Sequence, residues 1–151
     1  MIKFIKMDLL PLIKIPDERL RTPTQEVTVF DEQLREFVQQ MHATMHNFNG
    51  VGLAANQVGD FRRIFVIDEK LHKYNVFINP KIVKKALFTQ SYMEGCLSIP
   101  DKSFVIPRYY SIDIDYQDMD GKKHALWAAR GLAEVIQHEI DHLENRLIMD
   151  Y

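Results

Sequence analysis

Apolar residues recur at helical spacing in two parts of the chain. The first stretch, residues 31–47, opens with Asp31, a residue type that caps helix N-termini well. Its apolar stripe is formed by Leu34, Phe37, Val38, Met41 and Met45. The second stretch, residues 131–147, repeats the pattern with Leu132, Val135, Ile136, Ile140 and Leu143. Such stripes are typical of helices that pack one face against a core, so we predict two amphipathic helices.

Between these helices the pattern changes to short runs of β-branched and aromatic residues. We predict strands at residues 64–67, 74–78, 82–87, 104–106, 112–116 and 124–127. Asp120-Gly121 separates the last two runs and predicts a hairpin. The order of elements favours an α+β fold, with mainly antiparallel sheets packed around a central C-terminal helix and an N-terminal helix beside them.

Composition and charge favour a single domain over residues 1–151. The chain is 46% hydrophobic, and 151 residues suffice for one buried core but are few for two. Its formal charge of -2 is mixed along the sequence and gives no broad basic face, so direct binding to nucleic acid is not expected. No apolar run reaches the roughly 20 residues that span a bilayer, and Asp8 and Pro11 interrupt the first segment, so neither a membrane helix nor a signal peptide is predicted.

The second predicted helix carries the strongest chemical pattern, His138-Glu139-Ile140-Asp141-His142. Two imidazoles four residues apart lie on the same face of a helix and can bind one metal ion. Glu139 falls within the apolar arc, where burial would raise its pKa toward that of a general base. The structural alternative is a pair of histidines at the edge of the core with a buried glutamate paired to an arginine.

A catalytic metal of this kind needs a third protein ligand, and Cys96 can supply it as a thiolate. Because Cys96 is the only cysteine, it forms no intramolecular disulfide, and a reducing compartment is expected. A cysteine nucleophile served by a histidine is the rival role. His42 and His46 are also four residues apart, but they lack an intervening glutamate and lie beside an apolar stripe, so we interpret them as ordinary boundary residues.

Three segments now stand in order along the chain: a glycine-rich loop at 50–57, the segment Glu94-Gly95-Cys96-Leu97-Ser98, and residues 137–143. Together they resemble the peptide deformylase family. The likeness begins at Pro16-Asp17-Glu18-Arg19-Leu20-Arg21 and continues through Asn79-Pro80 and Val105-Ile106-Pro107-Arg108 to Met149-Asp150-Tyr151. The chain is similar to short forms of the family that lack the further C-terminal helix of many relatives.

The resemblance implies a cytoplasmic metallohydrolase, bacterial or acting in host cytoplasm if viral. Its substrate would be the N-formylmethionyl end of a nascent polypeptide, formate would be released, and contact with the ribosome would be transient. Cys96, His138 and His142 would hold one Fe(II) ion per chain, for which zinc, nickel or cobalt can substitute. Ligand chemistry by itself favours zinc. The remaining alternatives are a metallopeptidase with the same helical motif and an inactive binding module with the same fold.

The resemblance also implies roles for residues around the metal. Glu139 would be the general acid/base, and Gln57 together with the backbone N–H of Leu97 would stabilise the oxyanion. The residues expected to bind substrate are Gly50, Val51, Gly52, Glu94 and Arg108. Gly131 and Glu134 depart from the family pattern near its methionine pocket, which leaves the substrate preference open.

Overall fold

The computed structural model describes residues 7–151. Within this range the helices are α1 (Glu32–Asn47) and α2 (Arg130–Leu143), and the short 3-10 turns are η1 (Glu18–Arg21), η2 (Ala55–Val58) and η3 (Ile148–Asp150). The strands are β1 (Gly52–Ala54), β2 (Ile64–Ile67), β3 (Val76–Lys85), β4 (Thr89–Cys96), β5 (Ile99–Tyr109), β6 (Ser111–Gln117) and β7 (Lys123–Ala129). None of the described helices is long and apolar enough to cross a membrane.

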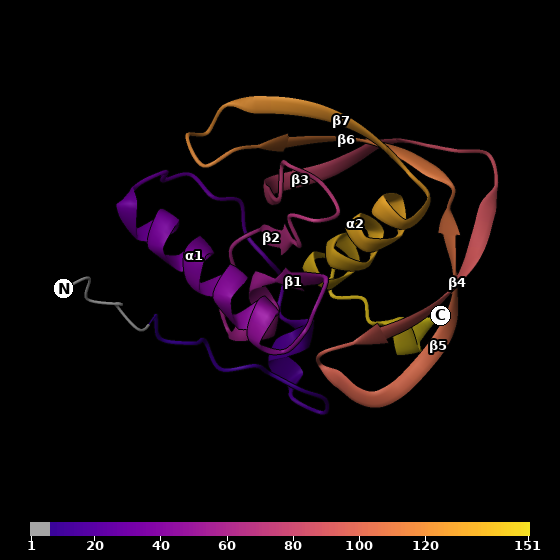
Figure 1. Ribbon diagram of the computed structural model, residues 1–151, viewed down its shortest axis with the longest axis horizontal. Helices are drawn as coiled ribbons and strands as arrows, with labels where there is room; N and C mark the ends of the chain where they lie inside the picture. Colours follow the sequence, from indigo (N-terminus) through magenta and orange to yellow (C-terminus); the bar gives the residue numbers. More distant parts are fainter. Residues whose placement is uncertain (1–6) are drawn as a thin grey trace.

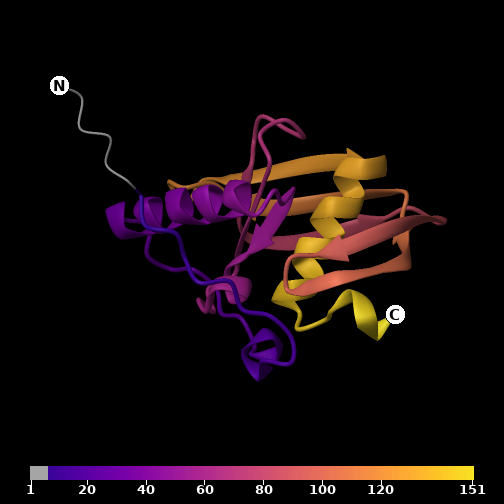
Figure 2. The same ribbon diagram turned by 60° about the horizontal axis from the view of Figure 1, so that its bottom comes forward.

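The strands form two antiparallel sheets around α2. One sheet has the order β1-β2-β3-β6-β7, and β4 pairs with β5 in a separate hairpin. Figure 1 shows α2 between the five-stranded sheet and this hairpin, with α1 beside β1 and β2. Figure 2 shows the chain after α2 turning back beneath the hairpin, where η3 contacts β4 and β5. The predicted α+β arrangement around a central C-terminal helix is confirmed.

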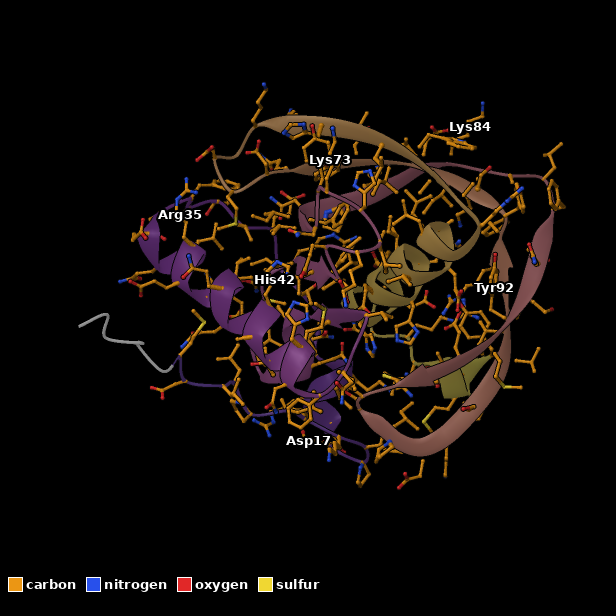
Figure 3. All side chains as sticks on the ribbon, viewed as in Figure 1. Asp17, Arg35, His42, Lys73, Lys84 and Tyr92 are labelled. Atoms are coloured by element: carbon orange, nitrogen blue, oxygen red, sulfur yellow. The ribbon has the colours of Figure 1, made fainter. Side chains whose placement is uncertain are left out.

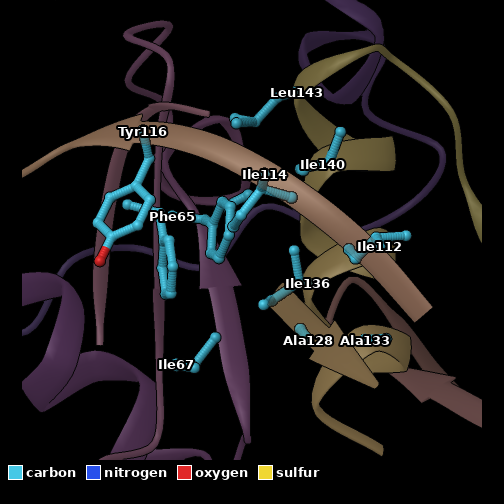
Figure 4. Close-up of a cluster of buried hydrophobic side chains, with 12 residues drawn as sticks. Phe65, Ile67, Ile112, Ile114, Tyr116, Ala128, Ala133, Ile136, Ile140 and Leu143 are labelled. Atoms are coloured by element: carbon cyan, nitrogen blue, oxygen red, sulfur yellow. The ribbon is translucent and has the colours of Figure 1, made fainter. Parts of the chain in front are cut away.

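The core is organised by β2, whose four residues are fully buried. Phe65 and Ile67 face α2, where they join Ile136 and Ile140 in one cluster (Figure 4). The other two β2 side chains, Ile64 and Val66, belong to the cluster under α1. The α1 residues of that cluster are Leu34, Val38, Met41 and Met45. Because successive strand residues point to opposite faces, one apolar strand ties both helices to the same sheet.

The prediction of separate strands at 74–78 and 82–87 is wrong, because β3 runs continuously through both regions. Asn79-Pro80 suggests a break in the sequence. In the structure Asn79 adopts a φ of 51°, and the register between β3 and β6 shifts there. A bulge therefore accommodates the proline without ending the strand.

Most of the predicted glycine-rich loop at 50–57 forms β1 and η2, and β5 extends well beyond the strand predicted at 104–106. Two further differences concern β4 and the end of the last helix. β4 was not predicted, because its residues are mostly polar and exposed and lack an alternating apolar pattern. The last helix ends at Leu143 and not at residue 147, since Asn145 adopts a left-handed φ of 63° that stops the helix. Both differences affect the site, because β4 ends at Cys96 and the early helix end lets the chain turn back beneath the hairpin.

Candidate metal centre and catalytic cleft

The fold brings Cys96, His138 and His142 together. The two histidines lie one above the other on α2, and Cys96 lies at the end of β4. The sulfur and one ring nitrogen from each histidine all lie within 4.8 Å of one another, with Cys96 Sγ 3.3 Å from His142 Nε2. Among residues 7–151 this is the one group of three or more potential ligands with such spacing. One thiolate and two imidazoles form a donor set suited to zinc or another transition metal.

Glu94 fixes the orientation of the His138 ring. His138 Nδ1 lies 2.8 Å from Glu94 Oε2, and because a carboxylate only accepts, Nδ1 donates the proton and Nε2 faces the other ligands. Burial lowers the pKa of His138, but hydrogen bonds to Cys96 and Glu94 outweigh it and raise this pKa to about 10. A metal ion would replace a proton at this position, so metal binding is expected to release protons.

His142 is held as a neutral ring deep in the protein. Burial, together with the charges of His138 and Arg108, lowers the pKa of His142 well below its ordinary value. Asn56 on η2 donates from Nδ2 to the backbone oxygen of His142 over 2.6 Å, which ties the glycine-rich segment to α2. A neutral imidazole is the form that binds metal, so the environment of His142 suits a ligand.

Glu139 is buried beside the two histidines, as the helical arc predicted. Its side chain is only 3% exposed, and Oε2 has no hydrogen-bond partner among the described residues. Burial raises the pKa of Glu139 to about 7, although the neighbouring His138 pulls it down. A carboxylate with a pKa near the working pH can both accept and return a proton, which suits a general acid/base.

Gln57 presents its amide nitrogen to Cys96. The backbone N–H of Ala54 donates to Gln57 Oε1 over 2.9 Å, which fixes the orientation of the amide. Gln57 Nε2 then lies 3.0 Å from Ser98 Oγ and 3.7 Å from Cys96 Sγ. Gln57 and Leu97 both line the cleft, so each can place an N–H donor beside a reacting carbonyl.

The cleft over this centre has a volume of about 630 Å³. Its lining includes the predicted segment Gly50–Gly52, of which Gly52 begins β1. From α2 it includes Glu134, His138 and Glu139. It is open to solvent and large enough for several residues of an extended peptide. The exposed Val51 stands at its edge.

Glu94 and Arg108 were predicted to bind substrate; Glu94 lines the large cleft, and Arg108 lies behind it. Both side chains are buried, and Arg108 forms a two-bond ion pair with Glu94 over 2.7 and 2.8 Å. Arg108 does not line the large cleft. The geometry favours a supporting role for this pair behind His138, because its polar atoms are already used inside the protein.

Sequence reasoning missed the residues that hold these groups in place. Ser98 accepts from Gln57, Asn56 binds the His142 backbone, and Asp141 pairs with Arg108. Asp141 and Ser98 lie inside the recognised motifs, so their positions offered a signal. Asn56 also lies inside a recognised motif, the segment at 50–57, but its partner on α2 becomes known only when the folded chain brings η2 against α2.

His42 and His46 do not form a second metal centre. Both lie on α1, with ring centroids 6.4 Å apart, and Figure 3 shows His42 on this helix, away from α2. His46 lies 3.2 Å from Glu69, and the pair belongs to no three-ligand group in the described range. Their interpretation as boundary residues agrees with this position.

Comparisons with known proteins agree with the geometry. The polypeptide deformylase family model matches residues 9–151. Peptide deformylase 1 of Rickettsia conorii is 44% identical over 154 residues, covering 96% of this chain and 88% of the relative. The crystal structure of peptide deformylase from Thermotoga maritima has a TM-score of 0.91 at 37% identity, covering 95% and 97% of the two chains. That of a probable peptide deformylase from Synechococcus phage S-SSM7 has a TM-score of 0.88 at 38% identity, covering 94% and 99%.

An H-E-x-x-H helix beneath an open cleft, with a glutamate poised for proton transfer, defines the class of the protein as a hydrolase. The match over almost the whole chain is more specific. The chain belongs to the polypeptide deformylase family, and its function is peptide deformylation.

Proposed function

We propose that this protein hydrolyses the formyl group from N-formylmethionyl ends of nascent polypeptides with a metal ion held by Cys96, His138 and His142. The observation that carries the proposal is the convergence of these three ligand atoms within 4.8 Å, beside the buried Glu139 and under an open cleft. The rival role of Cys96 as a nucleophile is less well supported. A nucleophile needs one histidine as its base, whereas both His138 and His142 place a ring nitrogen within 4.8 Å of the sulfur, as metal ligands would.

The residues fit a metal ion in their donor atoms and in their supports. Glu94 leaves His138 Nε2 available, burial keeps His142 neutral, and the cleft leaves one side open to substrate and water. When bound, the metal would supply Lewis acidity, lowering the pKa of water and polarising the formyl carbonyl.

The chain's own groups would perform the proton transfers and hold the substrate. The Glu139 carboxylate accepts a proton from the attacking water and returns it to the leaving amine, which yields formate and a free amino terminus. Gln57 Nε2 and the Leu97 backbone N–H donate to the oxygen that becomes negative. The Gly50–Gly52 segment lines the cleft, and those of its backbone groups that are not already bonded to Met45, Asp68 and β2 would pair with the extended peptide.

Metal removal tests the proposal directly. Protein purified without oxygen is expected to carry one divalent metal per chain and to release formate from a formyl-Met-Ala-Ser peptide. Chelation should abolish release, and readdition of Fe(II), nickel or cobalt should restore it, because the ligand set accepts several transition metals. Metal content and formate are measured on the same samples. Stoichiometric metal without formate release would reject the proposed reaction, and full activity after complete metal removal would reject the metal.

We infer that Fe(II) is the native ion and that the enzyme works in the cytoplasm, of a bacterium or of an infected host cell, where formylated chains arise. Contact with the ribosome would then be transient. Loss of activity in air with retention in the nickel form would support iron, because Fe(II) is oxidised and nickel is not under these conditions.

Glu134 is expected to weaken the binding of an apolar first residue. It lines the cleft one turn before His138, is partly buried, and forms no ion pair within residues 7–151. An apolar methionine side chain beside it would have to desolvate a carboxylate. Glu134→Leu should therefore lower KM for formyl-Met peptides by about 3- to 10-fold with little change in kcat, measured by steady-state kinetics. Glu36→Leu, on the exposed side of α1, is the control, and an unchanged or higher KM for Glu134→Leu would contradict the interpretation.

A further inference from the structure

A buried network of hydrogen bonds begins at His138 and runs away from the cleft. His138 Nδ1 donates to Glu94 Oε2, which also accepts from Arg108 Nη2 over 2.8 Å. Arg108 Nε donates to the other Glu94 oxygen over 2.7 Å, and Arg108 Nη1 donates to Asp141 Oδ2 over 2.6 Å. The guanidinium is only 2% exposed, so both carboxylates serve to satisfy a buried cation.

The outer end of this network is Tyr151. Its hydroxyl donates to Asp141 Oδ2 over 2.7 Å and accepts from Arg108 Nη1 over 2.8 Å. Its ring covers the network, with the Arg108 guanidinium 5.0 Å and the Arg146 guanidinium 3.6 Å from the ring centroid. The same residues border a smaller cavity of about 350 Å³, separate from the cleft.

We propose that Tyr151 is a positioning residue for the metal centre, because its hydroxyl holds Asp141 and Arg108 in the arrangement that fixes Glu94 and, through Glu94, the His138 ligand. This inference rests on the proposed function, since it concerns the geometry of the same centre. Tyr151 does not line the cleft, and its hydroxyl bonds to Arg108 and Asp141.

The geometry explains how a residue this far away can act on His138. Arg108 has N–H groups directed at Glu94, Asp141 and the Tyr151 oxygen, so each partner limits the rotation of one rigid, planar group. Burial raises the pKa of Tyr151 to about 12, so the phenol keeps the proton that it donates to Asp141. Loss of this hydroxyl would leave Asp141 and Arg108 each short of one partner and let water from the small cavity compete for them.

Tyr151→Phe tests the proposal, because it removes the hydroxyl and keeps the ring. In the full chain loaded with Co(II), the dissociation constant measured by competition with a chelator is expected to rise about 3- to 10-fold, since groups that orient metal ligands typically contribute more than this. The visible absorption of the bound Co(II) should shift, because the His138 ring is less tightly oriented. Deformylation by the loaded enzyme should fall in kcat more than it changes in KM.

Two comparisons separate positioning from general stability. Tyr110→Phe removes a similar hydrogen bond, from Arg130 Nε to a tyrosine hydroxyl, with no connection to His138, and should change neither the Co(II) spectrum nor the affinity. Asp141→Asn interrupts the network between Tyr151 and Arg108. If Tyr151 acts through Asp141, adding Tyr151→Phe to Asp141→Asn should weaken Co(II) binding further by less than it does in the unchanged chain.

The outcomes are distinct. Wild-type protein that binds no Co(II) would overturn the proposed metal centre, and the positioning role with it. If the wild-type protein binds Co(II) and Tyr151→Phe changes neither the Co(II) spectrum nor the Co(II) affinity, the positioning role alone is overturned. Equal effects of Tyr151→Phe and Tyr110→Phe would also overturn it. Fully multiplicative effects with Asp141→Asn would overturn the route through Asp141 and leave the direct bond to Arg108 as the route. A shifted spectrum and weaker binding in Tyr151→Phe alone would support it.

Discussion

Replacement of Glu139 by glutamine is expected to abolish most turnover while the metal stays bound. Glutamine keeps the size of the side chain in a site that is only 3% exposed, but its amide cannot accept and return a proton at neutral pH. General acid/base groups typically contribute 10²- to 10⁴-fold, so we expect kcat/KM for formyl-Met-Ala-Ser to fall by about that factor.

Metal analysis decides what a loss of activity in Glu139→Gln means. The ligand atoms belong to Cys96, His138 and His142, and no atom of Glu139 is among them, so the metal content should match that of the wild-type protein. A variant that loses both metal and activity would show that Glu139 has a structural role. Unchanged turnover in the metal-loaded variant would remove Glu139 from the mechanism and revive the view of the fold as a binding module.

The elements that the sequence predicts well are those in which burial imposes a period. β6 alternates strictly, with Ile112, Ile114 and Tyr116 buried and the residues between them more exposed, and the predicted strand is correct. α1 begins after Asp31, whose side chain accepts from the backbone N–H of Leu34 over 3.0 Å, as the predicted cap requires. In these elements local pattern and tertiary packing demand the same structure.

The sequence fails where tertiary contacts outweigh local preference. β4 has few buried residues, and its strand is defined by pairing with β5, which spacing along the chain does not reveal. Arg108 and Glu94 look like charged groups for a ligand, yet each satisfies the other inside the protein. Such pairing depends on two strands whose register is known only after folding.

The site shows the same division between local and long-range information. The spacing of His138 and His142 on a helix predicts a shared face, because that relation is local. The approach of Cys96 to within 3.3 Å of His142 spans 46 residues. Ligand chemistry named Cys96 as a candidate and the family resemblance supported it, but no spacing along the chain predicts the approach. Burial of Glu139 could be inferred from the helical arc, but the group that packs against its carboxylate could not.

That group is Gly52, and Gly52→Ala is expected to reduce kcat strongly without removing the metal. A Cβ at Gly52 would lie 2.4 Å from Glu139 Oε1 and 2.9 Å from its Cδ, far inside normal contact distance. Glu139 is buried among packed side chains, so its carboxylate must move to make room. Because a misplacement of about 1 Å in a reacting group can reduce the rate by about 10²-fold, we expect a loss of about 10- to 100-fold. Formate release and metal content of the purified variant measure the effect.

Gly131→Ala provides the matched control, since a Cβ at Gly131 meets no atom within 4 Å and alanine favours the helix there. That variant should keep normal activity, whereas Gly52→Ala loses it. If Gly52→Ala were as active as the control, the close contact with Glu139 would have no catalytic consequence. If it lost metal as well, the substitution would have disturbed the ligands and not the carboxylate alone. Loss of turnover with metal retained would show that the missing side chain of Gly52 is what allows Glu139 to stand beside the metal centre.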